Sequence, residues 1–428
     1  MTTLIIFSIL AVLMLTGMPV SIALGLTVLT FLFTLTQVPL EAVALKLFTG
    51  IEKFEIMAIP FFILAGNFLT HGGVAKRMIR FASDMVAHLN GGLGLAGVVA
   101  CALFAAVSGS SPATVVAIRS ILLPAMVRAG FPGSFGAGII TTSGALGILI
   151  PPSIVMVMYS VSTNTSVGAL FMAGVVPGLG LALVLGLTTW FIAKKNNYPR
   201  LPKASMAQRM KSFRESIWGL LLIVVVMGGI YSGIFTPTEA AAMSAVYAFI
   251  VAVFVYKDMG LKDVPRVLLS SANMSAMLLY IITNAVLFSF LLTHENIPQA
   301  MADWMLDKGL GVVTFLLVVN IILLIAGNFM EPSSIVLIFS PILFPVAMKL
   351  GIDPVHFGIM MVVNMEIGMC TPPVGLNLYV ASGIAKMGIT ELTKVVTPWL
   401  LAMLGFLMLV TYWPDMSLWF PRWLGMIG

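Results

Sequence analysis

Four short stretches interrupt long apolar runs with residue types that can bind a hard cation. They are SGSSPAT at 108–114, GILIPPS at 147–153, GNFMEPSS at 327–334 and GMCTPPV at 368–374. Proline removes a backbone donor and frees the carbonyl one turn back. Freed carbonyls, together with Ser and Thr hydroxyls, are oxygen ligands that suit Na⁺. Irregular backbone at membrane depth persists only where it is buried in protein or lines a wet cavity, so these stretches predict ion sites.

We predict two sodium sites, each formed by a hairpin tip and a helix break. The first is predicted to use Ser108, Gly109, Ser110, Ser111, Gly147, Ile150 and Pro151. The second is predicted to use Gly327, Asn328, Pro332, Gly368, Thr371 and Pro372. The alternative is that these positions are hinges and close-packing glycines that bind no ion. No other cofactor is expected.

A charged residue, Arg119, lies within the apolar segment VVAIRSILLP. Ionisable residues inside a membrane are functional candidates, and an arginine can pair with a substrate carboxylate. The alternatives are a partner acid nearby or a side chain that reaches the cytoplasmic surface. Asn67, Pro152, Ser153 and Pro373 are also predicted to contribute to a substrate site.

Two acids also lie at membrane depth, Glu331 at the second tip and Glu366 before the second break. Either could be a proton or cation site, and anchoring of a hydrogen-bond network is the simpler interpretation. A membrane-embedded enzyme would need a catalytic pair at this depth. Ser108, Ser110 and Ser111 have no His or Lys placed to activate them, so no catalytic residue is predicted and the protein is expected not to be an enzyme.

The composition indicates what must hold these stretches in place. Of 428 residues, 60% are hydrophobic and 9% are charged, and the mean hydropathy is +1.09. Soluble domains are about 45–50% apolar and about 25% charged. We therefore predict an all-α polytopic membrane protein with roughly ten to twelve spans of about 20 residues. The sequence contains no P-loop and no HExxH motif, which excludes ATP-driven pumping and zincin chemistry.

An internal repeat relates the two halves of the chain. A set of Pro and Gly positions recurs later in the chain at one constant offset: Pro124, Gly130, Gly147, Pro151 and Pro152 match Pro345, Gly351, Gly368, Pro372 and Pro373. The alternative is coincidence among apolar, Gly-rich segments. When the spans are threaded alternately, the two hairpins enter from opposite sides. The repeat is then inverted, which is typical of secondary transporters.

The predicted organisation has two repeats and a linker. The first repeat, 1–193, comprises scaffold helices, an interfacial arm helix at 38–56, a re-entrant hairpin at 93–127 and a broken helix at 134–162. The second repeat, 217–428, comprises a hairpin at 311–350, a broken helix at 356–381 and a last helix at 395–412. The linker, 194–216, carries seven basic residues. By the positive-inside rule it is cytoplasmic, and the arm lies on the opposite side.

The LAGN at 64–67, the SGSSPAT motif and the two GxxxPP breaks carry a resemblance that covers the whole chain. The sequence resembles the large membrane subunit of tripartite ATP-independent periplasmic (TRAP) transporters, the DctM-like family. The fold resembles the wider group of ion transporters with paired hairpins and an elevator mechanism. The resemblance implies Na⁺-coupled uptake of an organic acid across a bacterial inner membrane. It also implies a small four-helix membrane subunit and a separate periplasmic substrate-binding protein.

Family substrates include C4-dicarboxylates and sialic acids. Arg119 lies outside the pattern expected of the family generally, and favours a bulky sugar acid such as sialic acid. The main alternative is a self-sufficient Na⁺/carboxylate symporter of the same architecture that works without partner subunits. A channel is a further alternative. The lipid bilayer is the expected surrounding, and no nucleic acid is expected because the basic residues flank spans.

Overall fold

The computed structural model describes residues 2–36, 38–309, 311–385 and 387–427. Over these ranges the chain forms helices and loops, with no strand. Eight of the described helical segments are long and apolar enough to cross a membrane: Phe54–His71, Ser111–Arg128, Val167–Lys195, Met206–Tyr231, Pro237–Val255, Val264–His294, Pro332–Lys349 and Ile389–Tyr412. The prediction of an all-α, multi-pass membrane protein is confirmed.

The number of full-length spans is lower than expected because several apolar helices are too short to cross a bilayer alone. These shorter segments are Ile5–Leu15, Val20–Leu35, Gly92–Ser108, Ile154–Thr163 and Val312–Gly327. They include one arm of each hairpin and the second half of a broken helix. Several predicted ranges contain residues that lie outside the described part of the chain: Met1, Gln37, Leu310, Lys386 and Gly428.

The N-terminal region supplies part of the outer frame. Its elements are α1 (Thr2–Leu15), α2 (Val20–Leu35), α3 (Leu40–Thr49), η1 (Phe54–Met57), α4 (Ala58–His71) and α5 (Val74–Val86). The segment predicted as one interfacial helix at 38–56 is therefore α3 followed by a turn. The turn leads into η1, which continues directly into α4.

The first hairpin and the first broken helix follow. They are α6 (Gly92–Ser108), α7 (Ser111–Arg128), α8 (Gly133–Ser143), η2 (Gly144–Ile148) and α9 (Ile154–Thr163). Gly109 ends α6 in the left-handed conformation, with a φ of 59°, which glycine adopts without a steric penalty. The break between η2 and α9 contains a cis peptide bond between Pro151 and Pro152.

Four long helical segments connect the halves. They are α10 (Val167–Lys195), α11 (Met206–Tyr231), α12 (Pro237–Ile250) with its one-turn extension η3 (Val251–Val255), and α13 (Val264–His294). Within the predicted linker only a short loop separates α10 from α11. A capping box of Ser205 and Gln208 fixes the start of α11 by satisfying backbone donors at both positions.

The C-terminal region repeats the hairpin and the broken helix. Its elements are α14 (Ile297–Asp307), α15 (Val312–Gly327), α16 (Pro332–Lys349), α17 (Pro354–Gly368), α18 (Leu376–Ala385), α19 (Ile389–Tyr412) and α20 (Asp415–Trp423). The second break contains a cis peptide bond between Pro372 and Pro373. The last predicted helix, 395–412, corresponds to α19, which begins earlier, and α20 was not predicted.

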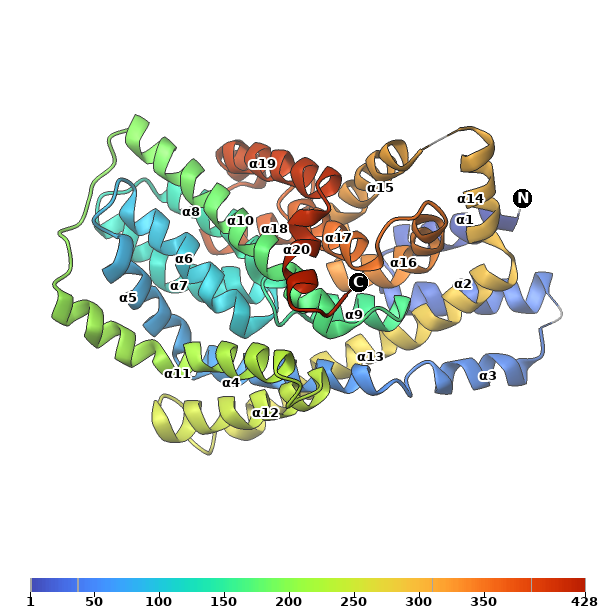
Figure 1. The fold of residues 1–428 in the computed structure, drawn as a ribbon, viewed down its shortest axis with the longest axis horizontal. Helices are drawn as coiled ribbons and strands as arrows, with labels where there is room; N and C mark the ends of the chain where they lie inside the picture. Colours follow the sequence, from blue (N-terminus) through green and yellow to red (C-terminus); the bar gives the residue numbers. More distant parts are fainter. Residues whose placement is uncertain (1, 37, 310, 386, 428) are drawn as a thin grey trace.

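The two hairpins and two broken helices obey the offset that the sequence predicts. Helices α7 and α16 both have 18 residues, and their starts, at Ser111 and Pro332, are separated by that same offset. The starts of α8 and α17, at Gly133 and Pro354, are separated by it as well. In Figure 1 the first hairpin lies toward the left end of the molecule and the second toward the right end. The structure thus contains both predicted hairpins and both predicted broken helices.

These elements form two groups. Figure 1 shows α4, α11, α12 and α13 along one long side of the molecule and α15 and α19 along the other. Helix α4 packs against α12 and α13, and α11 packs against α5 and α12. In the other group α16 packs against α9, α15 against α17, and α19 against α8 and α10. The hairpins and broken helices thus form one group, the hairpin group. Beside it lies the long-helix group, which consists of α4, α11, α12 and α13.

Candidate functional site

The first hairpin tip lies directly on the first break. A Cβ atom placed on Gly147 would lie 2.6 Å from the Ser111 Cα and 2.7 Å from the Ser110 carbonyl oxygen. A Cβ on Gly109 would lie 3.1 Å from the Pro152 carbonyl oxygen. Only glycine allows this approach of two backbones, so the first set of predicted sodium ligands is brought together in one place.

Hydroxyl groups make the first tip rich in oxygen. The Ser108 and Thr114 hydroxyls lie 2.8 Å apart, and the Thr114 hydroxyl donates to the Ser110 carbonyl at 2.9 Å. The Ser111 hydroxyl donates to the Gly144 carbonyl at 2.8 Å. A hydroxyl oxygen has two acceptor lone pairs besides its proton, so these side chains add acceptors to the carbonyls of the tip, although the Ser111 oxygen already accepts one hydrogen bond from the Asn377 amide.

The second tip and break form the same kind of contact. A Cβ on Gly327 would lie 2.8 Å from the Gly368 Cα. The backbone N–H of Gly375 donates to the Asn328 carbonyl at 3.0 Å, and the Thr371 hydroxyl donates to a carbonyl one turn back at 2.7 Å. The Asn328 side-chain oxygen is buried and has no hydrogen-bond partner in the described part of the chain. It is therefore a free acceptor at the tip.

The remaining members of the second predicted set lie at the same contact. Pro332 is buried at the first position of α16, directly after the tip. Pro372 is half-buried and Pro373 is exposed, whereas Pro151 and Pro152 of the first break are both buried. The second break therefore lies nearer the protein surface than the first.

Two buried side chains of the second broken helix bond to the first repeat, one to its break and one to its hairpin tip. The Glu366 carboxylate, on α17, accepts a hydrogen bond from the Ile148 N–H of the first break at 2.9 Å. The Asn377 amide, on α18, donates to the Ser111 hydroxyl at 2.7 Å. Glu366 and Asn377 are both fully buried. Glu366 thus joins a hydrogen-bond network through Oε1, whereas its Oε2 is buried without a partner in the described part of the chain.

Asn377 was not predicted as a site residue, because an Asn shortly after a Pro-Pro pair, within an apolar run, is a weak signal on its own. Ser143 and Asn364, which the offset of the repeat relates to each other, were not predicted either. Among the described residues, the Ser143 hydroxyl and the Asn364 side-chain oxygen are buried without a hydrogen-bond partner. Asn364 precedes Gly368 by one turn of α17, so its free oxygen lies on the helix face of that glycine, and Ser143 is the last residue of α8, directly before η2.

Arg119 lies on α7 and is 1% exposed. One terminal nitrogen, Nη1, donates to the Ala381 carbonyl of α18. The other two nitrogens, Nε and Nη2, have no partner within the described ranges. Within those ranges no acid pairs with Arg119, and its buried side chain does not extend to the cytoplasmic surface. Neither alternative considered from the sequence is therefore seen in the structure. Two free N–H groups on a buried guanidinium match the two oxygens of a carboxylate.

The other predicted substrate residues are less uniform. The Asn67 amide donates to the Ser271 hydroxyl at 2.8 Å, which joins α4 to α13. The Ser153 hydroxyl accepts the Met156 N–H at 3.4 Å and caps α9. Ser153 thus lies at the first break, where its side chain caps α9. The Asn67 side chain is hydrogen-bonded to Ser271 of α13, within the long-helix group.

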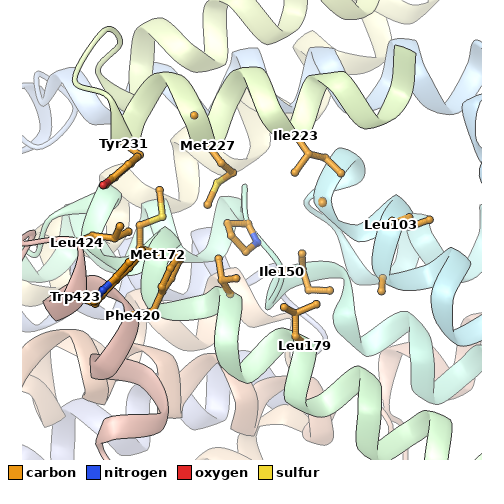
Figure 2. Close-up of a pocket in the computed structure, with 15 residues that line it drawn as sticks. Leu103, Ile150, Met172, Leu179, Ile223, Met227, Tyr231, Phe420, Trp423 and Leu424 are labelled. Atoms are coloured by element: carbon orange, nitrogen blue, oxygen red, sulfur yellow. The ribbon is translucent and has the colours of Figure 1, made fainter. Parts of the chain in front are cut away.

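An apolar cavity of about 540 Å³ lies between α10 and α11. Figure 2 shows Met172 and Leu179 of α10 facing Ile223 and Met227 of α11, with Ile150 between them. Because Ile150 and Pro151 line this cavity with their side chains, only their backbone carbonyls are suited to an ion. The lining of this cavity is mostly apolar and includes no charged residue, so it is poorly suited to a carboxylate that would lose its hydration there.

Two hairpin tips resting on two broken helices, in an all-helical multi-pass chain, define a secondary-transporter fold. The solved YdaH transporter of Alcanivorax borkumensis has this fold, with a TM-score of 0.62, 17% identity and coverage of 88% of this chain and 89% of that chain. Residues 7–416 match the family described as "Tripartite ATP-independent periplasmic transporter, DctM component", and the chain belongs to that family. It is a multi-pass protein of the bacterial inner membrane.

Relatives at higher identity include two proteins named for a C4-dicarboxylate. The C4-dicarboxylate TRAP transporter large permease protein DctM of Rhodobacter capsulatus is 75% identical, and the alignment covers 100% of both chains. The protein of that name from Pseudomonas aeruginosa is 55% identical, over 94% of this chain and 95% of its own. The sialic acid TRAP transporter large permease protein SiaM of Vibrio cholerae is 37% identical, over 95% of each chain.

Proposed function

We propose that this protein is the large permease of a Na⁺-coupled transporter that imports a C4-dicarboxylate. The relatives named for C4-dicarboxylates, at 75% and 55% identity, support this substrate over the sialic acid of the relative at 37%. The protein moves its substrate without a catalytic step. A buried Arg119 suits a small dicarboxylate as well as a sugar acid, since both present a carboxylate.

The observation that carries the proposal is the matched pair of tip–break contacts. The donor sets fit Na⁺, because each combines backbone carbonyls with a neutral oxygen that lacks a partner in the described part of the chain. At the second site that oxygen belongs to Asn328, and Asn364 lies one turn before the break glycine. At the first site Ser143 holds the place equivalent to Asn364. Ions bound at both contacts would hold each tip against its break.

The substrate site is proposed to lie between these contacts and Arg119. The two free N–H groups of Arg119 would bind one carboxylate. Ser153 with Pro152, and Pro373 with the half-helix that follows it, would present helix N-termini, whose positive dipole ends favour the other carboxylate. Asn67 would act from the long-helix group, close to the first tip.

Transport is proposed to follow an elevator mechanism. The hairpin and broken-helix group would slide along α4, α11, α12 and α13. The apolar cavity between α10 and α11 supports a boundary between a moving group and a fixed group at this place, because few polar contacts would have to break there during sliding. We also propose that a periplasmic binding protein delivers the substrate and that a small four-helix membrane subunit completes the frame. The isethionate permease DctMQ of Oleidesulfovibrio alaskensis is longer, and this chain covers 66% of it.

The test is uptake of labelled succinate into proteoliposomes that contain this chain, its small subunit and its binding protein. We expect accumulation that requires an inward Na⁺ gradient and the binding protein, and release of unchanged succinate when the vesicles are lysed. A K⁺ gradient of equal size is the control. Uptake indifferent to Na⁺ would overturn the coupling. Accumulation without the binding protein would favour the self-sufficient symporter, and equilibration without accumulation would favour a channel.

A further inference from the structure

A second cavity lies away from the tip–break contacts, at the end of the molecule that carries α3. Its volume is about 220 Å³, and it is enclosed by α3 and the turn after it, α9, α13 and α16. Figure 1 places α3 at the right end, far from the loop between α10 and α11 at the left. By the predicted topology this is the periplasmic side. The cavity lies between the long-helix group and the hairpin group.

Two lysines from the arm line this cavity. Lys46 belongs to α3 and Lys53 to the turn that follows, and Thr49, Ser162 and Ser289 contribute hydroxyls. None of the described lining residues is acidic. Within the described part of the chain, neither lysine forms an ion pair. The lining of the cavity, as far as the structure describes it, therefore carries two positive charges and no acid.

The contacts of Lys53 show how its charge is held. Its Nζ donates to the Val161 carbonyl at 2.5 Å and to the Asn164 side-chain oxygen at 2.7 Å. An ammonium has three donors, so one remains. Burial lowers the pKa of Lys53, and the nearby Glu55, which lines the adjoining cavity, opposes this only in part. An anion bound beside Lys53 would offset the desolvation of its ammonium.

The second lysine is held more loosely. The Lys46 Nζ lies 5.6 Å from the centroid of the Phe290 ring, a cation–π contact that leaves its N–H groups free. Apolar side chains of α13 and α16, including Ile282 and Leu337, complete the lining. Two ammonium groups beside a short apolar wall match a small molecule with a carboxylate at each end. The cavity is smaller than most pockets for drug-sized ligands, which also favours a small dianion.

We propose that this two-lysine cavity, lined by Lys46 and Lys53, is a separate binding site for a small dicarboxylate, which it holds on the periplasmic side ahead of the tip–break region. The staging role rests on the proposed function, whereas binding at the cavity does not. The site needs no Na⁺, because its ligands are cationic. It also couples the substrate to both helix groups, since α3 and α13 face α9 and α16 across it.

The test is sodium-free binding of succinate to the purified full-length chain in lipid nanodiscs, measured by titration calorimetry in choline buffer. We expect one site per chain. Lys46→Gln and Lys53→Gln should each weaken binding about tenfold, which equals about 1.4 kcal/mol. Lys53→Arg should keep most of the affinity because it keeps the charge. Butyrate, with one carboxylate, should bind much more weakly than succinate.

The matched control is Lys349→Gln, which removes one positive charge on the same predicted side. Lys349 pairs with Asp303 at the surface, at 3.0 Å, and does not line the cavity. Thermal unfolding of every variant checks that it is folded. The site is overturned if folded wild-type protein binds no succinate without Na⁺, or if Lys349→Gln weakens binding as much as the cavity variants.

Uptake by the same variants in the complete transporter separates this inference from the proposed function. A raised KM for succinate with an unchanged maximal rate supports the staging role. An unchanged KM, in variants that have lost sodium-free binding, overturns that role. If wild-type protein transports no dicarboxylate yet still binds succinate at the two lysines, the proposed function fails and the binding site stands.

Discussion

Replacing Gly368 by alanine tests whether the second tip–break contact forms a sodium site. Gly368 lies at the end of α17, where its backbone meets that of Gly327 at the end of α15. A Cβ on residue 368 would lie 2.7 Å from the Gly327 Cα and 3.1 Å from its carbonyl carbon. Both neighbours are backbone atoms, which cannot rotate away as a side chain would.

The size of the effect follows from this geometry. Carbon atoms rest about 3.5–4.0 Å apart at best contact, so the tip must move away from the break by about 1 Å. Overpacking of this kind costs about 1–3 kcal/mol. If the penalty falls on the ion-bound form, in which tip and break are held together, sodium affinity drops roughly 5- to 150-fold. The movement also separates the Asn328 carbonyl from the Gly375 N–H, a bond of 3.0 Å.

The assay is the sodium dependence of thermal unfolding of the purified chain, followed by the sodium dependence of succinate uptake. Gly368→Ala should need a higher Na⁺ concentration in both. Gly405→Ala is the control, because a Cβ at Gly405 in α19 meets nothing within 4 Å. A folded Gly368→Ala protein with wild-type sodium dependence in both assays would refute the assignment of this contact to Na⁺.

Two further substitutions test the groups around the contacts. Arg119→Gln removes the buried guanidinium that donates to Ala381. The KM for succinate should rise roughly 10- to 150-fold, because losing a hydrogen bond to a charged group costs about 1.5–3 kcal/mol. The sodium dependence of unfolding should stay unchanged. A parallel shift in sodium dependence would place Arg119 at an ion site instead. Glu366→Gln keeps an acceptor for the Ile148 N–H and should unfold near the wild-type temperature, whereas Glu366→Leu leaves that donor buried without a partner, at about 1–3 kcal/mol, and should unfold at a clearly lower temperature. Equal unfolding temperatures for the two Glu366 variants would contradict a bond between the breaks.

The main features of the fold could be predicted because membrane burial leaves a strong sequence signal. Long apolar runs, proline pairs and the constant offset between matching Pro and Gly positions predict hairpins and broken helices. The number of full spans was harder to predict, because apolarity alone does not separate a full span from a half-helix such as α9. Helix α20 was missed because Trp419, Trp423 and the residues between them form a short amphipathic segment rather than an apolar run.

The candidate site was predictable only in its backbone. Glycine and proline mark places where the chain turns or approaches another backbone, so Gly147 and Gly368 are visible in the sequence. Asn377 and Ser143 are not, since an isolated polar residue in an apolar run is common and gains meaning from what surrounds it. The hydrogen-bond partner of Arg119 could not be predicted either, because it is a carbonyl 262 residues away in the sequence.

The cross-links between the breaks bear on how two ion sites would act on one substrate. Glu366 of the second repeat bonds Ile148 of the first, and Asn377 bonds Ser111. Each break therefore reaches a partner in the other repeat, through side chains that are fully buried and cannot exchange these bonds for water. Under the proposed function, an ion that moves one tip by a fraction of an ångström would also change the geometry of the other tip–break contact, because the groups of a buried hydrogen-bond network shift together. Two separate sodium sites with no shared bonds would give no such dependence, so the cross-linked arrangement favours cooperative over independent sodium binding.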